Sequence, residues 1–121
     1  MKKTLPHRIV LNSFRLAGVS IFGVLCLTQT VQAQTDQLKK LMLANNCMAC
    51  HMIDKRKYGP EFTEVANKYA ADKGAVEMLA KKIKAGGTGV WGEDVMPPQP
   101  QVSAADAKTI ATLIMSLKPK E

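Results

Sequence analysis

The five residues CMACH, at positions 47–51, constrain this chain more than any other part of its sequence. Two cysteines are separated by two residues, and a histidine follows the second cysteine directly. Three chemistries use such a pattern: a redox-active dithiol, part of a zinc site, and covalent attachment of haem c. The remaining sequence discriminates among these three.

The amino-terminal residues have the form of a secretory signal peptide. The chain of 121 residues is long enough for one small domain. Its start is positively charged, through Lys2, Lys3, Arg8 and Arg15. An apolar run over 16–27 follows, and Val31 and Ala33 occupy the small-residue positions that signal peptidase reads. We therefore expect residues 1–33 to be cleaved and 34–121 to form one domain. A retained membrane anchor is the alternative, although 12 apolar residues fall short of the roughly 18 that suggest a spanning helix.

Cleavage at this point would simplify both the chemistry and the charge of the domain. Cys26 and His7 would be removed, so that Cys47, Cys50 and His51 remain as its only cysteines and histidine. Four of the 17 basic residues and none of the 10 acidic ones would also leave, and 13 basic against 10 acidic residues give a net charge of +3. Such a mild charge favours docking on acidic protein surfaces over nucleic-acid binding.

The hydrophobic pattern of the domain predicts an all-α fold with no convincing strand. Apolar residues recur at helical spacing in four segments. Ser103 and Asp106 form a capping-box pattern at the start of the last segment, and Asp36 is the expected cap of the first. The expected helices cover about 36–46, 61–70 and 74–85, and a last one runs from 103 to near Pro119.

A long loop, from Gly86 to Val102, precedes the last helix and is expected to be functional. Loops of this length in a compact domain are either functional or disordered. This one contains the only tryptophan of the chain, Trp91, and a methionine, Met96, that stands directly before two prolines. The domain has four aromatic residues, too few for a substantial core, so we expect another group to fill its interior.

Covalent haem c is the chemistry that uses all five positions of CMACH. A thioredoxin-like dithiol would stand near a βαβ pattern, which is missing here. A structural zinc site needs four ligands, and the domain offers two thiolates and one histidine. In haem attachment each cysteine binds one vinyl group, while the adjacent histidine can ligate the iron from below. Export fits this interpretation, because haem is attached after translocation.

The sixth iron ligand is expected to be Met96. With one histidine in the domain, ligation by two histidines within one chain is excluded. The methionine candidates are Met42, Met48, Met52, Met78, Met96 and Met115. Met48 and Met52 flank the attachment motif too closely to reach the far side of the ring, whereas methionines on helices usually pack in cores. Met96 lies in the long loop, where Pro97 disfavours helical geometry. A gap-filling role in that loop is the alternative for Met96.

The segments NNCMACHMID, KYGPEFTEVANKY, LAKKIKAGGTGVWGEDVMPP and VSAADAKTIATLIMSLK make the domain similar to a known family. It resembles the short bacterial class I cytochromes c of the cytochrome c-551 type over nearly its whole length. The resemblance implies a small fold of about four short helices wrapped around one covalently bound haem c. It also implies that Cys47 and Cys50 carry the thioethers and that His51 and Met96 are the axial ligands.

The same resemblance implies roles for residues around the haem. Pro60 is expected to accept the second ring proton of His51 through its carbonyl oxygen, a kind of support that ligating histidines generally have. Trp91 is expected to donate its indole N–H toward a propionate. Lys82 stands where relatives often have an arginine or other basic residue near a propionate. A lysine can supply the positive charge there, but it cannot form the paired hydrogen bonds of a guanidinium. Several relatives have an asparagine at the position of Gln99. The sequence therefore does not predict which hydrogen bonds form around Met96.

These features together predict a soluble, monomeric periplasmic electron carrier rather than an enzyme. Methionine–histidine ligation favours ferrous iron, and a filled coordination sphere leaves no room for a substrate. By resemblance, the partners are a nitrite reductase or terminal oxidase and a quinol-oxidising complex. Basic residues near the motif are expected to steer docking: Lys39, Lys40, Lys55, Arg56 and Lys57. The alternatives are a haem enzyme or gas sensor with an open distal site, and a membrane-tethered subunit of a larger complex.

Overall fold

The computed structural model describes residues 22–117 of the chain. Its regular elements are α1 (Phe22–Ala44), a 3-10 turn η1 (Cys47–Ala49), α2 (Phe62–Lys68), α3 (Ala75–Ala85) and α4 (Ala104–Met115). Within the described residues, the only β-type pairing is an isolated bridge between Gly87 and Met96. The expected all-α fold is therefore confirmed.

The first helix differs from the prediction, because α1 begins at Phe22 and not at Asp36. No glycine or proline after Gly23 interrupts the segment, so nothing in the sequence ends the helix before Ala44. Asp36 is not an amino-terminal cap. Its carboxylate instead accepts a hydrogen bond, 3.0 Å long, from the Gln32 side chain one turn earlier.

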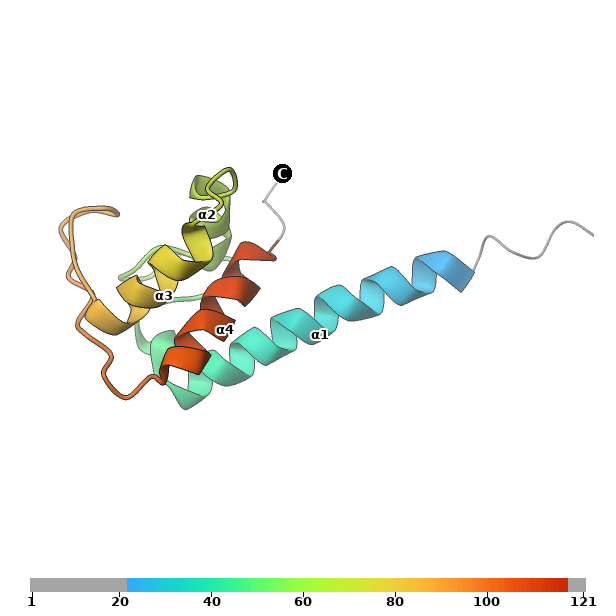
Figure 1. The fold of residues 1–121 in the computed structure, drawn as a ribbon, viewed down its shortest axis with the longest axis horizontal. Coiled ribbons are helices and arrows are strands. Elements are labelled where there is room, and N and C mark those ends of the chain that lie inside the picture. The colour runs from blue at the N-terminus through green and yellow to red at the C-terminus, as the bar shows by residue number, and fades with distance from the viewer. Residues whose placement is uncertain (1–21, 118–121) are drawn as a thin grey trace, which may run out of the picture.

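The amino-terminal half of α1 projects away from the other helices as a rod (Figure 1). The predicted cleavage point after Ala33 falls inside this helix, where residues 31–34 are all exposed. The charged start and part of the apolar run of the predicted signal peptide lie outside the described residues. Among residues 22–117, no helix combines the length and apolar character that crossing a membrane requires.

The helix α4 is the centre of the packing. It lies close to α1, α2 and α3, whereas in the described part of the chain the backbones of these three helices do not approach one another closely. Figure 1 shows α4 crossing α1 and running beside α3. The largest fully buried side chains are Leu38, Met42, Val102 and Ile110. The most deeply buried part of the core therefore lies between α1 and α4. The space between α2, α3 and α4 is not filled in the same way.

Most of the other helix boundaries agree with the sequence prediction within about two residues. The end of α4 differs, because the helix stops at Met115 and not near Pro119. The capping pattern before α4 is present as expected. The Ser103 hydroxyl oxygen accepts a hydrogen bond from the backbone N–H of Asp106 at 2.9 Å. This bond satisfies one of the free N–H groups of the first turn.

Because α4 contacts every other α-helix, its cap should matter to the whole domain. We expect the Ser103→Ala substitution to lower the free energy of unfolding by about 1 kcal/mol. Thr112→Ala is the matched control on the same helix, since Thr112 is exposed and its hydroxyl only bonds back to the Lys108 carbonyl. Denaturant titration of both variants checks this. Equal stability of the two variants would contradict the capping role.

Candidate haem site

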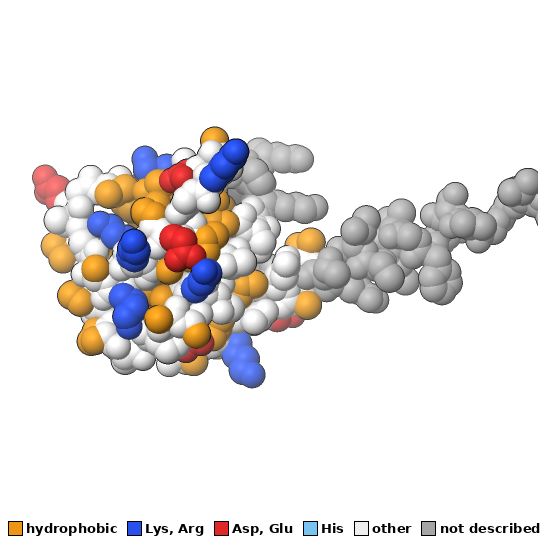
Figure 2. All heavy atoms as spheres, viewed as in Figure 1, with side chains coloured by type: hydrophobic (Ala, Val, Ile, Leu, Met, Phe, Trp, Pro, Cys, Tyr) orange, Lys and Arg blue, Asp and Glu red, His pale blue; other side chains and the backbone are white. Residues whose placement is uncertain are grey.

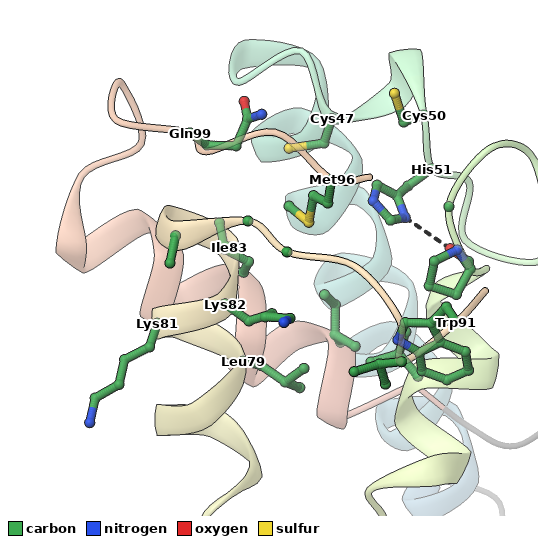
Figure 3. Close-up of a pocket in the computed structure, with 18 of the residues that line it drawn as sticks. Cys47, Cys50, His51, Leu79, Lys81, Lys82, Ile83, Trp91, Met96 and Gln99 are labelled. Atoms are coloured by element: carbon green, nitrogen blue, oxygen red, sulfur yellow. Dashed lines mark hydrogen bonds between the residues drawn. The ribbon is translucent and has the colours of Figure 1, made fainter. Parts of the chain in front are cut away.

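A large cavity lies between α2, α3, α4 and two loops. Its volume is about 770 Å³, within the range of small-molecule and cofactor sites. Apolar side chains from three helices form much of its wall: Phe62, Val65, Leu79, Ile83, Ile110 and Ile114. The cavity occupies the space between α2 and α3, whose backbones therefore lie apart. Figure 3 shows the side chains that surround it.

The two cysteines lie together at one side of this cavity. Cys47 opens the turn η1, and its carbonyl oxygen accepts hydrogen bonds from the N–H groups of Cys50 and His51, at 3.1 and 2.9 Å. Asn46 enters this turn in the left-handed conformation, with φ of 58°. Both thiols are free, half-buried and line the cavity. Burial raises the pKa of the Cys47 thiol above its ordinary value, although a backbone hydrogen bond acts in the opposite direction.

His51 is held in one orientation by its surroundings. Its Nδ1 lies 2.9 Å from the carbonyl oxygen of Pro60, drawn as a dashed line in Figure 3. A carbonyl oxygen only accepts, so Nδ1 carries a proton, and in the neutral form of the ring Nε2 is the nitrogen with the free lone pair. The imidazole also stacks on the ring of Phe62, with centroids 5.1 Å apart. The expected contact between His51 and Pro60 is thus present.

Gly59 is required for this arrangement, although the sequence alone did not single it out. A Cβ atom added at Gly59 would lie 2.3 Å from Cε1 of His51, a distance that real contacts do not reach. The backbone of Gly59 is in turn held in place, because its N–H donates to the Cys50 carbonyl at 2.9 Å. The ring of His51 therefore sits directly on a glycine backbone, with its edge bonded to Pro60.

Met96 is brought to the cavity from the loop between α3 and α4. The backbone of Met96 pairs with that of Gly87 through two hydrogen bonds, of 2.8 and 2.9 Å. Gly86 precedes this pair with φ of +69°, and a Cβ atom there would lie 2.3 Å from the carbonyl oxygen of Met96. The two glycines, which the sequence indicated only as a helix stop, therefore give the close backbone approach that positions Met96.

The other methionines occupy different places. Met42 is fully buried in the core, and Met115 is half-buried near the end of α4. Met78 lines the same cavity as Met96, from α3. Met48 lies between the two cysteines in η1. Of the methionines that line the cavity, Met96 is the one carried by a loop, as the sequence predicted.

Lys82 and Trp91 both reach into the cavity, as Figure 3 shows, whereas the neighbouring Lys81 points away from it. The ammonium of Lys82 lies against the backbone of Gly87. The half-buried indole of Trp91 meets the ring of Tyr69 edge to face, with centroids 6.5 Å apart. These positions put one cation and one indole at the cavity.

Gln99 also lines the cavity, close to the segment that follows Met96. Its backbone N–H donates to the Lys84 carbonyl at 3.0 Å, and its side-chain amide donates to the Pro97 carbonyl at 3.0 Å. The side chain of Lys84 donates to the Val102 carbonyl. The segment after Met96 is therefore fastened to the end of α3, and the Gln99 amide is already engaged with its own loop.

The residues present fit a covalently attached haem. Cys47 and Cys50 offer two free thiols at the cavity. His51 offers an imidazole whose Nδ1 is bonded to Pro60, which leaves Nε2 for a metal. Met96 offers a soft thioether from the other loop, and the walls between them are apolar. In the described residues no group of three or more histidine, cysteine or carboxylate side chains could hold a metal ion by itself. The donor set thus suits an iron porphyrin and not a bare metal ion.

Comparison with known proteins agrees with this chemistry. The family model for cytochrome c matches residues 37–118. Cytochrome c-552 of Nitrosomonas europaea is 43% identical over 101 residues, which cover 84% of this chain and 94% of that protein. Cytochrome c-552 of Hydrogenobacter thermophilus is 50% identical over 80 residues, which cover 66% of this chain and 81% of that protein.

The solved structures give the same result for the fold. The crystal structure of wild-type Nitrosomonas europaea cytochrome c552 has a TM-score of 0.65 and 46% sequence identity. The match covers 66% of this chain and 99% of that one. The motif CMACH, the helices around the cavity and these relatives lead to one assignment. The chain belongs to the cytochrome c family, as a small class I cytochrome c that carries one covalent haem c and serves as a monohaem electron carrier.

Proposed function

We propose that this protein is a periplasmic carrier that moves one electron at a time, with its iron ligated by His51 and Met96. The observation that carries the proposal is that two donors from different loops line one apolar cavity beside the two cysteines. By similarity to the cytochrome c-551 type, the carrier accepts electrons from a quinol-oxidising complex and delivers them to a nitrite reductase or terminal oxidase. When bound, the haem supplies an iron that alternates between the ferrous and ferric states.

The side chains of the protein prepare the cavity for this exchange. The Pro60 carbonyl fixes the tautomer of His51 and strengthens its donor nitrogen. Met96 is a soft donor, which favours the ferrous state and raises the reduction potential. Since both ligands are held by backbone contacts, little needs to move when the charge of the site changes. Trp91 and Lys82 are proposed to hold the propionates, because both reach into the cavity.

We expect Met96→Leu to open the distal side of the haem. The ferric protein should lose its methionine-to-iron charge-transfer band and its low-spin spectrum. Its affinity for added imidazole should rise by about tenfold or more, because the site no longer has an internal competitor. Met115→Leu is the matched control, since Met115 is half-buried at the end of α4 and does not line the cavity.

Optical titration of the ferric variants with imidazole makes this measurement. If Met96→Leu keeps the wild-type spectrum and affinity, the ligand assignment is wrong. A wild-type protein that is high-spin and binds carbon monoxide or cyanide tightly would instead indicate the open site of a haem enzyme or gas sensor.

The surface near the attachment motif supports docking on acidic partners. Lys39, Lys40, Lys55, Arg56 and Lys57 are all exposed. The ammonium of Lys57 donates to the carbonyl of Met48, between the two cysteines, at 3.3 Å, so this cation lies beside the haem attachment turn. Tyr58 and Val95 at the cavity are 67% and 70% exposed, which leaves apolar surface for a partner.

The charges are not gathered into one dense patch on the face drawn in Figure 2. Basic side chains are spread over that face, with acidic and hydrophobic ones between them. Such a distribution favours a weak, short-lived complex, as an electron carrier needs, and disfavours nucleic-acid binding.

Electron transfer to an acidic partner should therefore slow as ionic strength rises, because salt screens charges beyond about 10 Å at 0.1 M. We expect Lys55→Gln to lower the second-order rate constant at low salt by about twofold, a modest loss suited to one exposed charge. Thr112→Glu is the control, since it also makes the net charge more negative by one but lies in the groove between α1 and α4. Stopped-flow rates that are indifferent to salt, or equal in both variants, would exclude local steering.

We also propose that residues 1–33 are removed on export and that residues 34–121 form the mature, monomeric domain. The expected product is the cleaved chain plus one haem. Intact-mass spectrometry of protein expressed with its export machinery checks this. An intact chain plus one haem, recovered with membranes, would favour the tethered subunit instead.

A further inference from the structure

The loop that carries Met96 is a hairpin that is closed by its own backbone. Beyond the Gly87–Met96 pair, the Thr88 hydroxyl lies 3.2 and 3.3 Å from the carbonyls of Glu93 and Asp94. The N–H of Gly89 donates to the Gly92 carbonyl at 3.0 Å. These bonds fix the internal shape of the hairpin. They do not fix the position of its tip relative to the rest of the protein.

The tip of the hairpin is fastened through Trp91. The guanidinium of Arg56 donates a hydrogen bond to the Trp91 carbonyl oxygen at 2.8 Å, across 35 positions of sequence. The ammonium of Lys68, on α2, lies 5.3 Å from the centroid of the indole. The edge of the indole also meets Tyr69. Among these contacts, the Arg56 bond is the one that holds the backbone of the hairpin.

Arg56 belongs to the segment that positions the opposite ligand. That segment runs from His51 to Pro60, which are bonded to each other, and its return is held by the bond from Gly59 to Cys50. One side chain therefore connects the segment on the histidine side to the loop on the methionine side. Its guanidinium is permanently charged and offers several donors, so these donors remain available at every pH at which the protein folds.

We propose that Arg56 is a positioning residue that keeps Met96 on the iron by holding the tip of its hairpin. The inference depends on the proposed ligation by Met96. Without the Arg56 bond the tip is no longer held, so the hairpin opens more often from its tip toward the Gly87–Met96 pair. A larger fraction of molecules then has the thioether away from the iron. An added ligand then meets an available site more often, and its apparent affinity rises in proportion to that fraction.

The test compares Arg56→Met with Lys55→Met in the haem-loaded protein. Both substitutions remove one positive charge from adjacent exposed positions, but the structure gives Lys55 no contact with the hairpin. We expect Arg56→Met to tighten imidazole binding to the ferric protein by about threefold, a modest effect because the bond is exposed. Lys55→Met should leave the affinity unchanged, and Arg56→Lys, which keeps one donor, should recover part of the wild-type value.

A second measurement does not depend on the iron. Amide hydrogen exchange at Gly89, inside the hairpin, should be faster in Arg56→Met than in Lys55→Met, while exchange in α4 stays the same. Unchanged exchange in α4 also shows that the variant is folded. If Arg56→Met is too unstable to purify, Arg56→Leu, which also has no donor, serves in its place.

The outcomes separate the two proposals. If Arg56→Met and Lys55→Met give equal imidazole affinities and equal exchange, the positioning role is wrong, while ligation by Met96 stands. If wild type and Met96→Leu already bind imidazole equally, the ligation itself is wrong. Combining Arg56→Met with Met96→Leu should give the affinity of Met96→Leu alone, since there is then no thioether to hold.

Discussion

The hydrogen bond between His51 and the carbonyl of Pro60 is the interaction on which the site depends. It spans nine residues of loop and decides which nitrogen of the imidazole carries the proton. The ring can take this position only because Gly59 has no side chain, since any Cβ atom there would collide with it. One bond and one missing side chain thus hold the histidine in one orientation, with its Nδ1 engaged and its Nε2 left as the possible donor.

The rest of the fold is arranged around the space that this histidine faces. In the described residues the backbones of α1, α2 and α3 lie close to α4 but not to one another. A cavity lined largely by apolar side chains lies between α2, α3 and α4. A domain with so few aromatic side chains would otherwise bury too little surface to be stable. The covalent haem of the family is accordingly part of the core as well as the redox centre, and folding and function share the same contacts.

Several parts of this protein could be predicted from local sequence. CMACH specified the cofactor, because the spacing of two thiols and the adjacent histidine is a covalent requirement of the haem. The helices followed from the 3.6-residue spacing of apolar side chains, and Ser103 from its capping pattern, since both are governed by neighbours within one or two turns. The predicted start of α1 was wrong because it also relied on a local pattern. Asp36 is a residue type that can cap a helix, but no residue just before it breaks the helix that began at Phe22.

The sequence by itself determined the attachment chemistry, the helical class and the position of Met96 in a loop, because each depends on residue types at short separations. The tertiary structure decided what brings the two sides of the cavity together. Gly59 lies against a ring eight positions earlier, Gly87 pairs with Met96, and Arg56 reaches the carbonyl of Trp91. Those contacts join segments whose meeting depends on the path of the whole chain, so no local pattern of residues could have indicated them.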